Sequence, residues 1–343
     1  MIGILSKLKD GFSKERSCVG LDIGTSTIKI AKLKFAKDTV ELSGFDIESS
    51  KLDLADVLKK IKQPSASDHV NISVSGSQTV VRYANFPKMN ASELRQALKF
   101  EAQKHIPFSI PEVNIDGYIL KDDLPENKML VLIAAAKKEL VSSRLKLIES
   151  AGFSTNLVDM DSIALANAFI FNNPLPGNEE HKAIALLNIG ASVTNLDILE
   201  GGIPRLSRDM HIASNTFTQK IMDIFSLDFA AAENLKINPE SDAEKANKIR
   251  AAVESVLSNL ATEIRTSFDY YESQNASSVI KIYLSGGGAK FSGLKDMLAH
   301  LLGIEVEYWD PLEHIQINEA AGLEKAKAYS GQLAVAIGLA LRP

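Results

Sequence analysis

Two short segments of the chain share a pattern that could hold a phosphate group. Residues 21–26 read Leu-Asp-Ile-Gly-Thr-Ser and residues 187–192 read Leu-Asn-Ile-Gly-Ala-Ser, which are identical at four of six positions. The glycine permits close approach of the backbone, and the neighbouring amides and hydroxyls can donate hydrogen bonds to phosphate oxygens. Unrelated strand-turn-strand segments often look alike, so one match alone is weak. The repeat predicts two phosphate-binding turns that close on a nucleotide from opposite sides.

Two further motifs would complete such a site. Residues 283–289 (Tyr-Leu-Ser-Gly-Gly-Gly-Ala) join an apolar segment to a predicted helix, where a glycine-rich turn could pack against a flat base and ribose. Glu233 and Lys236 are one turn apart on the same face of another predicted helix. Such a pair by itself is typical of a solvated surface. The four motifs together, in this order, form a more specific pattern than any one of them.

The elements that must position these motifs alternate between strands and helices. Apolar periodicity predicts strands at 19–24, 27–34, 39–48, 70–75, 79–86, 113–121, 129–136, 153–158, 183–188, 193–199 and 280–284. It predicts helices at 52–61, 90–105, 137–151, 161–171, 213–226, 228–236, 242–275 and 332–341, with another starting near Gly293. Residues 87–155 form a compact α-β-β-α unit within this series, and 172–178 read as a linker.

Composition narrows the class of protein. The chain has 343 residues, 45% hydrophobic and 24% charged, which at about 150 residues per domain indicates two globular domains. The single cysteine, Cys18, excludes a disulfide framework, and the net charge of −5 gives no general attraction to nucleic acid. No apolar run reaches the roughly 18 residues that span a bilayer. Residues 1–17 are basic and apolar without the continuous segment of a signal peptide, so we expect a cytoplasmic protein.

The order of the four motifs resembles that of the actin-like ATPase superfamily. Further segments are similar to the PilM family of type IV pilus assembly proteins: the basic leader running into 19–29, 86–89 (Phe-Pro-Lys-Met), 158–161 (Val-Asp-Met-Asp) and 331–338 (Gly-Gln-Leu-Ala-Val-Ala-Ile-Gly). The unit at 87–155 occupies the place where FtsA and PilM proteins carry an extra subdomain. The resemblance extends from about residue 17 to the end of the chain.

This resemblance implies an α/β fold, namely an actin-like (ribonuclease H-like) two-domain ATPase fold with an FtsA/PilM-type inserted α-β-β-α subdomain. It divides the chain into a leader at 1–16, domain I at 17–86, 156–180 and 325–343, the inserted subdomain at 87–155, and domain II at 181–324.

The resemblance also implies roles for individual residues in binding ATP and Mg²⁺. Asp22 would face the hydrated magnesium ion, with Asn188 at the second metal-facing position, and Asp161 would orient the attacking water or, alternatively, cap its helix. The phosphates would be held by Gly24, Thr25, Ser26, Thr27 and Lys29 on one side and by Gly190, Ser192 and Thr194 on the other. The ribose and base would contact Glu233, Lys236, Gly286, Gly287 and Gly288.

Two departures from the family pattern bear on catalysis. Asn188 stands where many relatives have a magnesium-facing aspartate, and Ala191 replaces the polar or glycine residue of the faster ATPases. Phosphoryl transfer depends largely on electrostatic stabilisation. We therefore expect nucleotide binding with slow or no ATP hydrolysis, the nucleotide acting as a conformational ligand.

The family resemblance implies a cytoplasmic scaffold, peripheral to the inner membrane, in the assembly platform of a type IV pilus or a related type II secretion system. The expected partner is a PilN-like inner-membrane protein, whose cytoplasmic N-terminal peptide would bind in a groove beside the insert. Other platform components and motor ATPases are further candidate partners, and membrane association is expected to be mainly indirect.

Two alternatives stay open. An FtsA-like cell-division protein that forms membrane-tethered filaments would have to bind the membrane through residues 1–17, since the C-terminal anchor of FtsA is missing. A kinase for a small metabolite would need a substrate-binding insert, and none is recognisable in the sequence.

Overall fold

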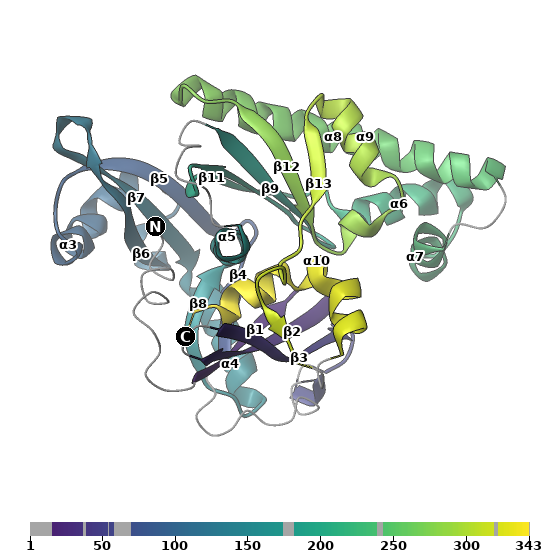
Figure 1. Ribbon diagram of the computed structural model, residues 1–343, viewed down its shortest axis with the longest axis horizontal. Helices are drawn as coiled ribbons and strands as arrows, with labels where there is room; N and C mark the ends of the chain where they lie inside the picture. Colours follow the sequence, from purple (N-terminus) through teal and green to yellow (C-terminus); the bar gives the residue numbers. More distant parts are fainter. Residues whose placement is uncertain are drawn as a thin grey trace.

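The computed structural model describes residues 16–36, 39–53, 55–57, 70–173, 182–238, 243–318 and 322–342 (Figure 1). Residues 1–15 of the expected leader, residues 54 and 58–61 of the expected helix at 52–61, and residues 174–178 of the expected linker lie outside these residues.

The first sheet has six strands in the order β14-β3-β2-β1-β4-β8. Three consecutive strands, β1, β2 and β3, form an antiparallel meander, and three more extend it in parallel: β4 and then β8 beside β1, and β14 beside β3. Their bounds are β1 (Arg16–Ile23), β2 (Thr27–Ala36), β3 (Thr39–Ser49), β4 (Val70–Val74), β8 (Thr155–Met160) and β14 (Gln316–Ile317).

Alternating side chains of β1 and β2 point to opposite faces of this sheet, and each face is covered by helices. On one face Cys18 and Leu33 pack with α5 (Asp161–Asn172) and α10 (Leu323–Ala340), and on the other Val19 packs with Ile148 of α4 (Lys138–Ser150). The crossing of α5 and α10 is so close that a Cβ at Gly338 would overlap the backbone carbonyl of Ala164.

The second sheet repeats this arrangement, with the strand order β11-β10-β9-β12-β13. An antiparallel meander is again extended by parallel strands. The strand bounds are β9 (Ala183–Ile189), β10 (Thr194–Glu200), β11 (Ile203–Met210), β12 (Val279–Ser285) and β13 (Glu305–Tyr308). The repeated six-residue motif therefore belongs to a repeated topology, with one copy in the β1–β2 turn and the other in the β9–β10 turn.

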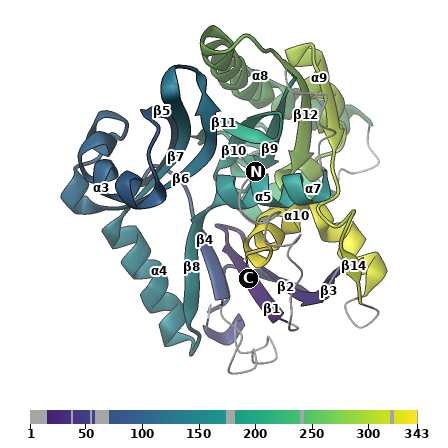
Figure 2. The same cartoon turned by 60° about the vertical axis from the view of Figure 1, so that its left-hand side comes forward.

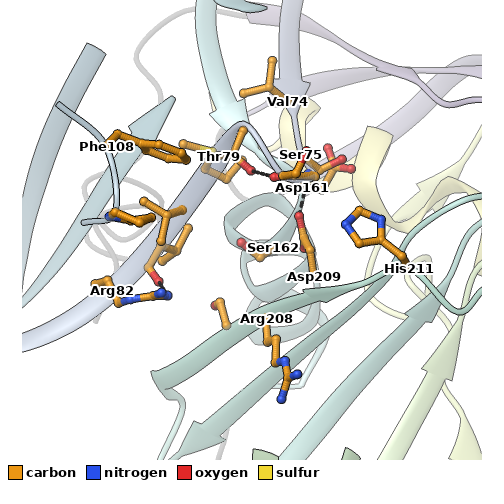
Figure 3. A pocket seen from close by; sticks show the side chains of 17 residues that line it. Val74, Ser75, Thr79, Arg82, Phe108, Asp161, Ser162, Arg208, Asp209 and His211 are labelled. Atoms are coloured by element: carbon orange, nitrogen blue, oxygen red, sulfur yellow. Dashed lines mark hydrogen bonds between the residues drawn. The ribbon is translucent and has the colours of Figure 1, made fainter. Parts of the chain in front are cut away.

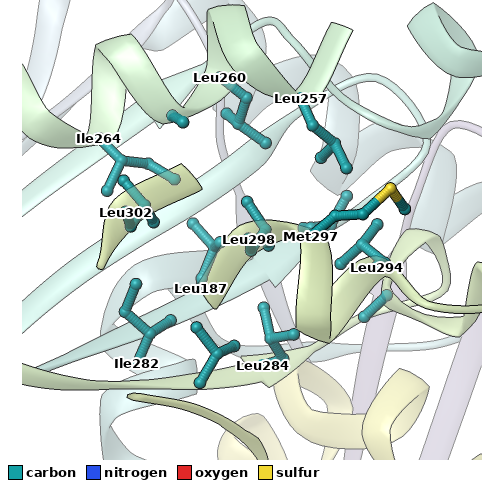
Figure 4. Packing of buried hydrophobic residues seen from close by; sticks show 14 of the residues in the cluster. Leu187, Leu257, Leu260, Ile264, Ile282, Leu284, Leu294, Met297, Leu298 and Leu302 are labelled. Atoms are coloured by element: carbon teal, nitrogen blue, oxygen red, sulfur yellow. The ribbon is translucent and has the colours of Figure 1, made fainter. Parts of the chain in front are cut away.

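Four helices accompany the second sheet: α6 (Ser214–Phe225), α7 (Phe229–Ile237), α8 (Ala243–Gln274) and α9 (Leu294–Leu302). Figure 4 shows how α8 and α9 face each other above the strands. Their contact is an apolar layer of buried side chains that includes Leu257, Leu260, Ile264, Leu294, Leu298 and Leu302, over Leu187, Ile282 and Leu284. This layer holds the ends of β9 and β12, which carry two of the predicted motifs, in one rigid unit.

The insert has its own three-stranded antiparallel sheet in the order β5-β7-β6, which stands beside the second sheet (Figure 2). Its strands are β5 (Thr79–Pro87), β6 (Val113–Leu124) and β7 (Lys128–Lys137), and its helix is α3 (Ala91–Glu101). A capping box opens α3, in which the Asn90 side chain accepts from the Glu93 amide and the Glu93 side chain accepts from the Asn90 amide. Short 3₁₀ turns occupy Ala102–Lys104, Ile110–Glu112, Pro125–Asn127 and Gly288–Lys290.

One strand differs from the expectation. The strand predicted at 79–86 was assigned to domain I, but β5 pairs with β7 of the insert from Thr79↔Ala136 to Pro87↔Lys128. The reason is the turn after β4, where Gly76 has a φ of +91° and redirects the chain into the insert's own sheet. The insert's sheet therefore has three strands rather than two, while α4 packs on domain I through Ile148. The exact domain boundaries stay a prediction.

Within the described part of the chain, no helix is both long enough and apolar enough to cross a membrane.

Candidate nucleotide site and adjoining cavity

The first predicted phosphate-binding turn joins β1 and β2. Asp22 and Lys29 are direct partners in the strand register, and Lys29 Nζ lies 2.8 Å from Asp22 Oδ2. The turn is closed by a hydrogen bond from Gly24 N to Thr27 O of 3.1 Å, and Ser50 Oγ donates to Gly24 O at 2.7 Å. Lys29 Nζ is only 2.9 Å from the position a Cβ would take at Gly24. The glycine is therefore what lets the ammonium group reach the turn.

The tip of this turn is open to solvent. Thr25 and Ser26 are exposed, and Thr27 is half-buried as the first residue of β2. The Ser26 carbonyl accepts from the backbone amide of Ser50 at 3.0 Å, which braces the tip from β3. The exposed hydroxyls of Thr25 and Ser26 thus stand at the tip, and the Lys29 ammonium group, held by Asp22, lies beside Gly24. Donors of these two kinds are the chemistry that a phosphate group requires.

The second turn joins β9 and β10 and is braced by α6. Gly190 N donates to Val193 O at 3.0 Å, and Gly190 O accepts from Ser214 N at 3.0 Å. Ser192 Oγ accepts from Asn215 Nδ2 at 3.2 Å, so it is held at the N-terminus of α6. The side chain of Thr194 is fully buried and donates to Ile212 O at 2.7 Å. The Thr194 hydroxyl therefore supports the turn from inside rather than facing the cleft.

Asn188 lies at the end of β9, next to the glycine-rich turn. Its Nδ2 donates to Asn195 Oδ1 at 2.9 Å, and its Oδ1 is 3.4 Å from Ser285 Oγ. The same Oδ1 lies 2.7 Å from where a Cβ would stand at Gly286, whose φ is +92°. The side-chain amide is thus oriented by its neighbours, with its oxygen toward the glycine-rich turn.

The three glycines of that turn have different surroundings. A Cβ at Gly288 would come within 2.5 Å of Ile189 Cγ2 and 3.1 Å of Ser214 Cβ. Gly287 is exposed, and a Cβ there would meet only Gln332 of α10, at 3.9 Å. Gly286 and Gly288 are therefore needed for close packing, whereas Gly287 presents its backbone to solvent. Gly286 N also donates to Gly331 O at 2.8 Å, which connects the turn to α10 of the first domain.

Glu233 and Lys236 form a partly buried ion pair rather than a solvated surface pair. Lys236 is 7% exposed, and its Nζ lies 2.7 Å from Glu233 Oε2. It also donates to Ser214 Oγ at 2.7 Å and to Thr218 Oγ1 at 2.8 Å. Burial lowers the pKa of Lys236, while Glu233 opposes that shift. The alternative of a solvated face is wrong for Lys236, because α7 packs this face against α6.

Ser214 connects the motifs of the second domain. Its amide holds Gly190, its hydroxyl receives Lys236 and its Cβ limits the space at Gly288. Sequence reasoning missed Ser214, although its position at the first turn of a predicted helix was a usable signal.

Asp161 is the first residue of α5, and Met160 is the N-cap, so the alternative role of Asp161 as a helix cap is wrong. Burial, followed by the negative charges of Asp22 and Asp209, raises the pKa of Asp161 to about 6. The carboxylate therefore lies near the first phosphate turn. It also lies near Asp209 of β11, and sequence reasoning did not single out that residue.

A cavity of about 240 Å³ adjoins Asp161, where the insert meets β11 (Figure 3). Its wall combines the β4–β5 turn, β5, the loop at Phe108, the start of α5 and residues of β11. Asp209 Oδ2 accepts from Gly76 N at 2.6 Å, and Tyr83 OH lies 2.8 Å from Ser207 Oγ. These two contacts join the insert and its base to the second domain.

A buried carboxyl group lies behind the contact between Tyr83 and Ser207. Asp197 of β10 is fully buried and accepts a hydrogen bond from Ser207, and burial raises its pKa well above the ordinary value. Burial also raises the pKa of the Tyr83 hydroxyl. The signal in the sequence was the placement of Asn195 and Asp197 inside an otherwise apolar strand, where buried polar groups need partners.

These residues fit a magnesium nucleotide. The turns of two hairpins carry the Lys29 ammonium group and the hydroxyls of Thr25, Ser26 and Ser192, and Asp22 supplies a carboxylate. Among the described residues, no group of three or more His, Cys, Asp or Glu side chains could hold a metal alone. In proteins Mg²⁺ usually takes one or two carboxylates and completes its shell with phosphate oxygens and water.

Comparison with known proteins places nearly all of the chain in one family. The family profile for the type IV pilus assembly protein PilM matches residues 20–343. A solved PilM-PilN type IV pilus biogenesis complex contains a chain that is 27% identical, with a TM-score of 0.81, and the alignment covers 95% of this chain and 98% of that one. The ethanolamine utilization protein EutJ from Carboxydothermus hydrogenoformans, 14% identical with a TM-score of 0.52, covers 96% and 90% respectively and shares the fold alone.

The expected two-domain actin-like fold is thereby confirmed, and so is the family resemblance. The chain belongs to the family of the type IV pilus assembly protein PilM.

Proposed function

We propose that this chain is a nucleotide-binding scaffold in the inner-membrane assembly platform of a type IV pilus or a related type II secretion system. It binds the cytoplasmic N-terminal peptide of a PilN-like protein and stands at the cytoplasmic face of the inner membrane, attached mainly through that partner. The observation that carries the proposal is the likeness over 95% of the chain to a protein whose structure is that of a PilM-PilN complex. The family match favours this function over an FtsA-like division protein.

The cavity beside Asp161 is the candidate groove for the peptide. Val80, Val81 and Arg82 of β5 line it together with Pro107 and Phe108 of the insert. In the described chain β5 is an edge strand of its sheet, paired on one side with β7. An extended peptide could pair with such an edge while its apolar side chains contact Phe108 and the valines.

Reversing a charge at the groove tests this assignment. Arg82 is exposed and lines the cavity, and Arg95 is exposed on α3 of the same insert without lining it. A fluorescently labelled N-terminal peptide of a PilN-like protein should bind the unaltered chain. Arg82→Glu should weaken that binding about tenfold or more, since a contact with a charged group is worth roughly 1.5–3 kcal/mol. Arg95→Glu, with the same change of charge, should leave it unchanged.

Two results would reject the proposal. If the peptide does not bind the unaltered chain at high micromolar concentration, the partner is wrong. If both variants bind as well as the unaltered chain, the peptide binds elsewhere.

The nucleotide is ATP with Mg²⁺, and its turnover is slow or absent. The Asp22–Lys29 pair and the donors of the two turns support binding. Asn188 supports slow turnover, because its neutral amide is oriented by Asn195 and Ser285 and adds no negative charge beside the metal.

A further inference from the structure

A row of polar side chains crosses the second sheet from the candidate nucleotide site to the β4–β5 turn, where the chain enters the insert. Asn188 of β9 is the register partner of Asn195 on β10, and Asn195 is the register partner of Asp209 on β11. Asn188 Nδ2 donates to Asn195 Oδ1 at 2.9 Å, and Asn195 Nδ2 donates to Asp209 Oδ1 at 2.8 Å. Three consecutive strands thus each contribute one member of a single hydrogen-bonded row.

Each end of the row lies at a different functional region. At one end, Asn188 Oδ1 lies 2.7 Å from the Cβ position of Gly286 in the glycine-rich turn. At the other end, Asp209 Oδ2 accepts the amide of Gly76 at 2.6 Å, and Asp209 also lines the cavity. Gly76 forms the turn between β4 of the first sheet and β5 of the insert, and its carbonyl accepts from Thr79 N at 3.0 Å and Thr79 Oγ1 at 2.9 Å.

We infer that the row Asn188–Asn195–Asp209 couples the nucleotide site to the groove beside the insert, so that occupancy of either site changes the affinity of the other. This inference rests on the proposed function, because it needs both ligands.

The physical basis is that every hydrogen bond in the row has a fixed direction. Asn195 is 3% exposed, so neither the oxygen nor the NH₂ group of its side-chain amide can exchange its partner for bulk water without cost. A ligand group that polarises Asn188 Oδ1 makes Asn188 Nδ2 a stronger donor, and that effect passes to the next bond in the row. The row then holds Asp209, and through it the Gly76 amide, more tightly.

The same chain of contacts acts in the other direction. A peptide that enters the cavity contacts Asp209 or displaces β5 from the Gly76 turn, and either event alters the partner of Asn195. Coupling between two binding sites is reciprocal, so the factor by which nucleotide tightens or weakens peptide binding must equal the factor by which peptide changes nucleotide binding.

Asn195→Leu interrupts the row at its middle and replaces a residue that does not line the cavity. Leucine has nearly the same size, so the strand can keep its packing. Asn247→Leu, at an exposed position of α8, is the matched control. For each chain, the dissociation constant of the labelled PilN-like peptide is measured without nucleotide and with saturating Mg-ATP.

In the unaltered chain and in Asn247→Leu, the two constants should differ by about fivefold or more, the lower end of common coupling factors. In Asn195→Leu, both ligands should still bind, and the ratio of the two constants should fall to about one. A ratio in Asn195→Leu equal to that of the unaltered chain would overturn the inference. So would a ratio of one in the unaltered chain with both ligands bound, and that result would leave the proposed function intact. If either ligand fails to bind the unaltered chain, the proposed function fails and the inference fails with it.

Hydrogen exchange at the Gly76 amide gives a second readout that needs no peptide and no catalysis. Mg-ATP should slow exchange of the segment that contains Gly76 about threefold or more in the unaltered chain, as the row tightens. Asp209→Asn is the second variant, for use if Asn195→Leu does not fold. Asp209 accepts from Asn195 through Oδ1 and from Gly76 through Oδ2. In asparagine an NH₂ group replaces one of these two oxygens, so one of the two donors loses its acceptor. The nucleotide effect should therefore disappear in Asp209→Asn, and its persistence there would contradict the inference.

Discussion

Lys29 Nζ lies 2.8 Å from Asp22 Oδ2, directly across the β1–β2 hairpin, and it reaches this position over a glycine that leaves room for it. The pair places a cation and a carboxylate side by side at a turn whose tip is exposed. A magnesium nucleotide needs both, since its phosphates are negative and its metal is positive.

Lys29→Met should lower the affinity for Mg-ATP about tenfold or more, because it removes a charged phosphate contact, which is worth roughly 1.5–3 kcal/mol. Lys34→Met is the matched control, since Lys34 is exposed further along the same strand. Titration with a fluorescent ATP analogue measures the affinity of each variant. Equal affinities in the two variants would show that Lys29 does not contact the phosphates.

Asn188→Asp should speed ATP hydrolysis about tenfold, because a carboxylate beside the metal adds the electrostatic stabilisation that phosphoryl transfer depends on. Single-turnover release of phosphate measures the rate. Asn188→Ala, which removes the amide without adding a charge, should stay at or below the rate of the unaltered chain. If Asp161 orients the attacking water, adding Asp161→Asn should return the rate of Asn188→Asp to its starting value. Rapid release by the unaltered chain would contradict this view of Asn188.

The raised pKa of Asp161 has a consequence for stability. Burial and the charges of Asp22 and Asp209 raise its pKa from an ordinary 3.8 to about 6. Between these values the folded chain keeps a proton that the unfolded chain releases, so this carboxyl lowers the free energy of unfolding as the pH rises from about 4 to about 6. Above that range its unfavourable contribution is complete.

Asp161→Asn removes the charge and should therefore be more stable than the unaltered chain at about pH 7.5. The difference in unfolding midpoint should shrink as the pH falls through 6 toward 4. Asp269→Asn, the same chemical change at an exposed position of α8, should show no such pH-dependent difference. Urea unfolding at a series of pH values measures the unfolding midpoint of each variant and of the unaltered chain. A stability difference for Asp161→Asn that does not vary with pH would contradict the raised pKa.

Gly338→Ala should destabilise the first domain by about 2 kcal/mol or more, because the added methyl group would overlap the carbonyl of Ala164 where α5 crosses α10. Gly331→Ala lies in the same helix with open space at the Cβ position, so it should instead stabilise by up to about 1 kcal/mol. Thermal or urea unfolding distinguishes the two signs. A mild effect of Gly338→Ala would mean that the two helices can separate easily.

The sequence by itself was enough to identify the repeated strand-turn-strand motif, the glycine-rich turn and the periodicity of nearly every element. These are local properties. A glycine between two strands or alternating apolar residues act within a few positions of the chain, so they remain visible without the fold. The capping box at Asn90 and Glu93 belongs to the same class.

Only the tertiary structure decided what lies next to these elements. It assigned β5 to the insert's sheet, because strand partners are chosen by packing between segments that are distant in the sequence, as with Thr79 and Ala136. It buried Lys236 against Ser214 and Thr218, which the spacing of Glu233 and Lys236 could not predict. It also aligned Asn188, Asn195 and Asp209 across three strands. Such contacts depend on strand register and on the approach of distant segments, and these are set by the packing of the whole core rather than by any local pattern.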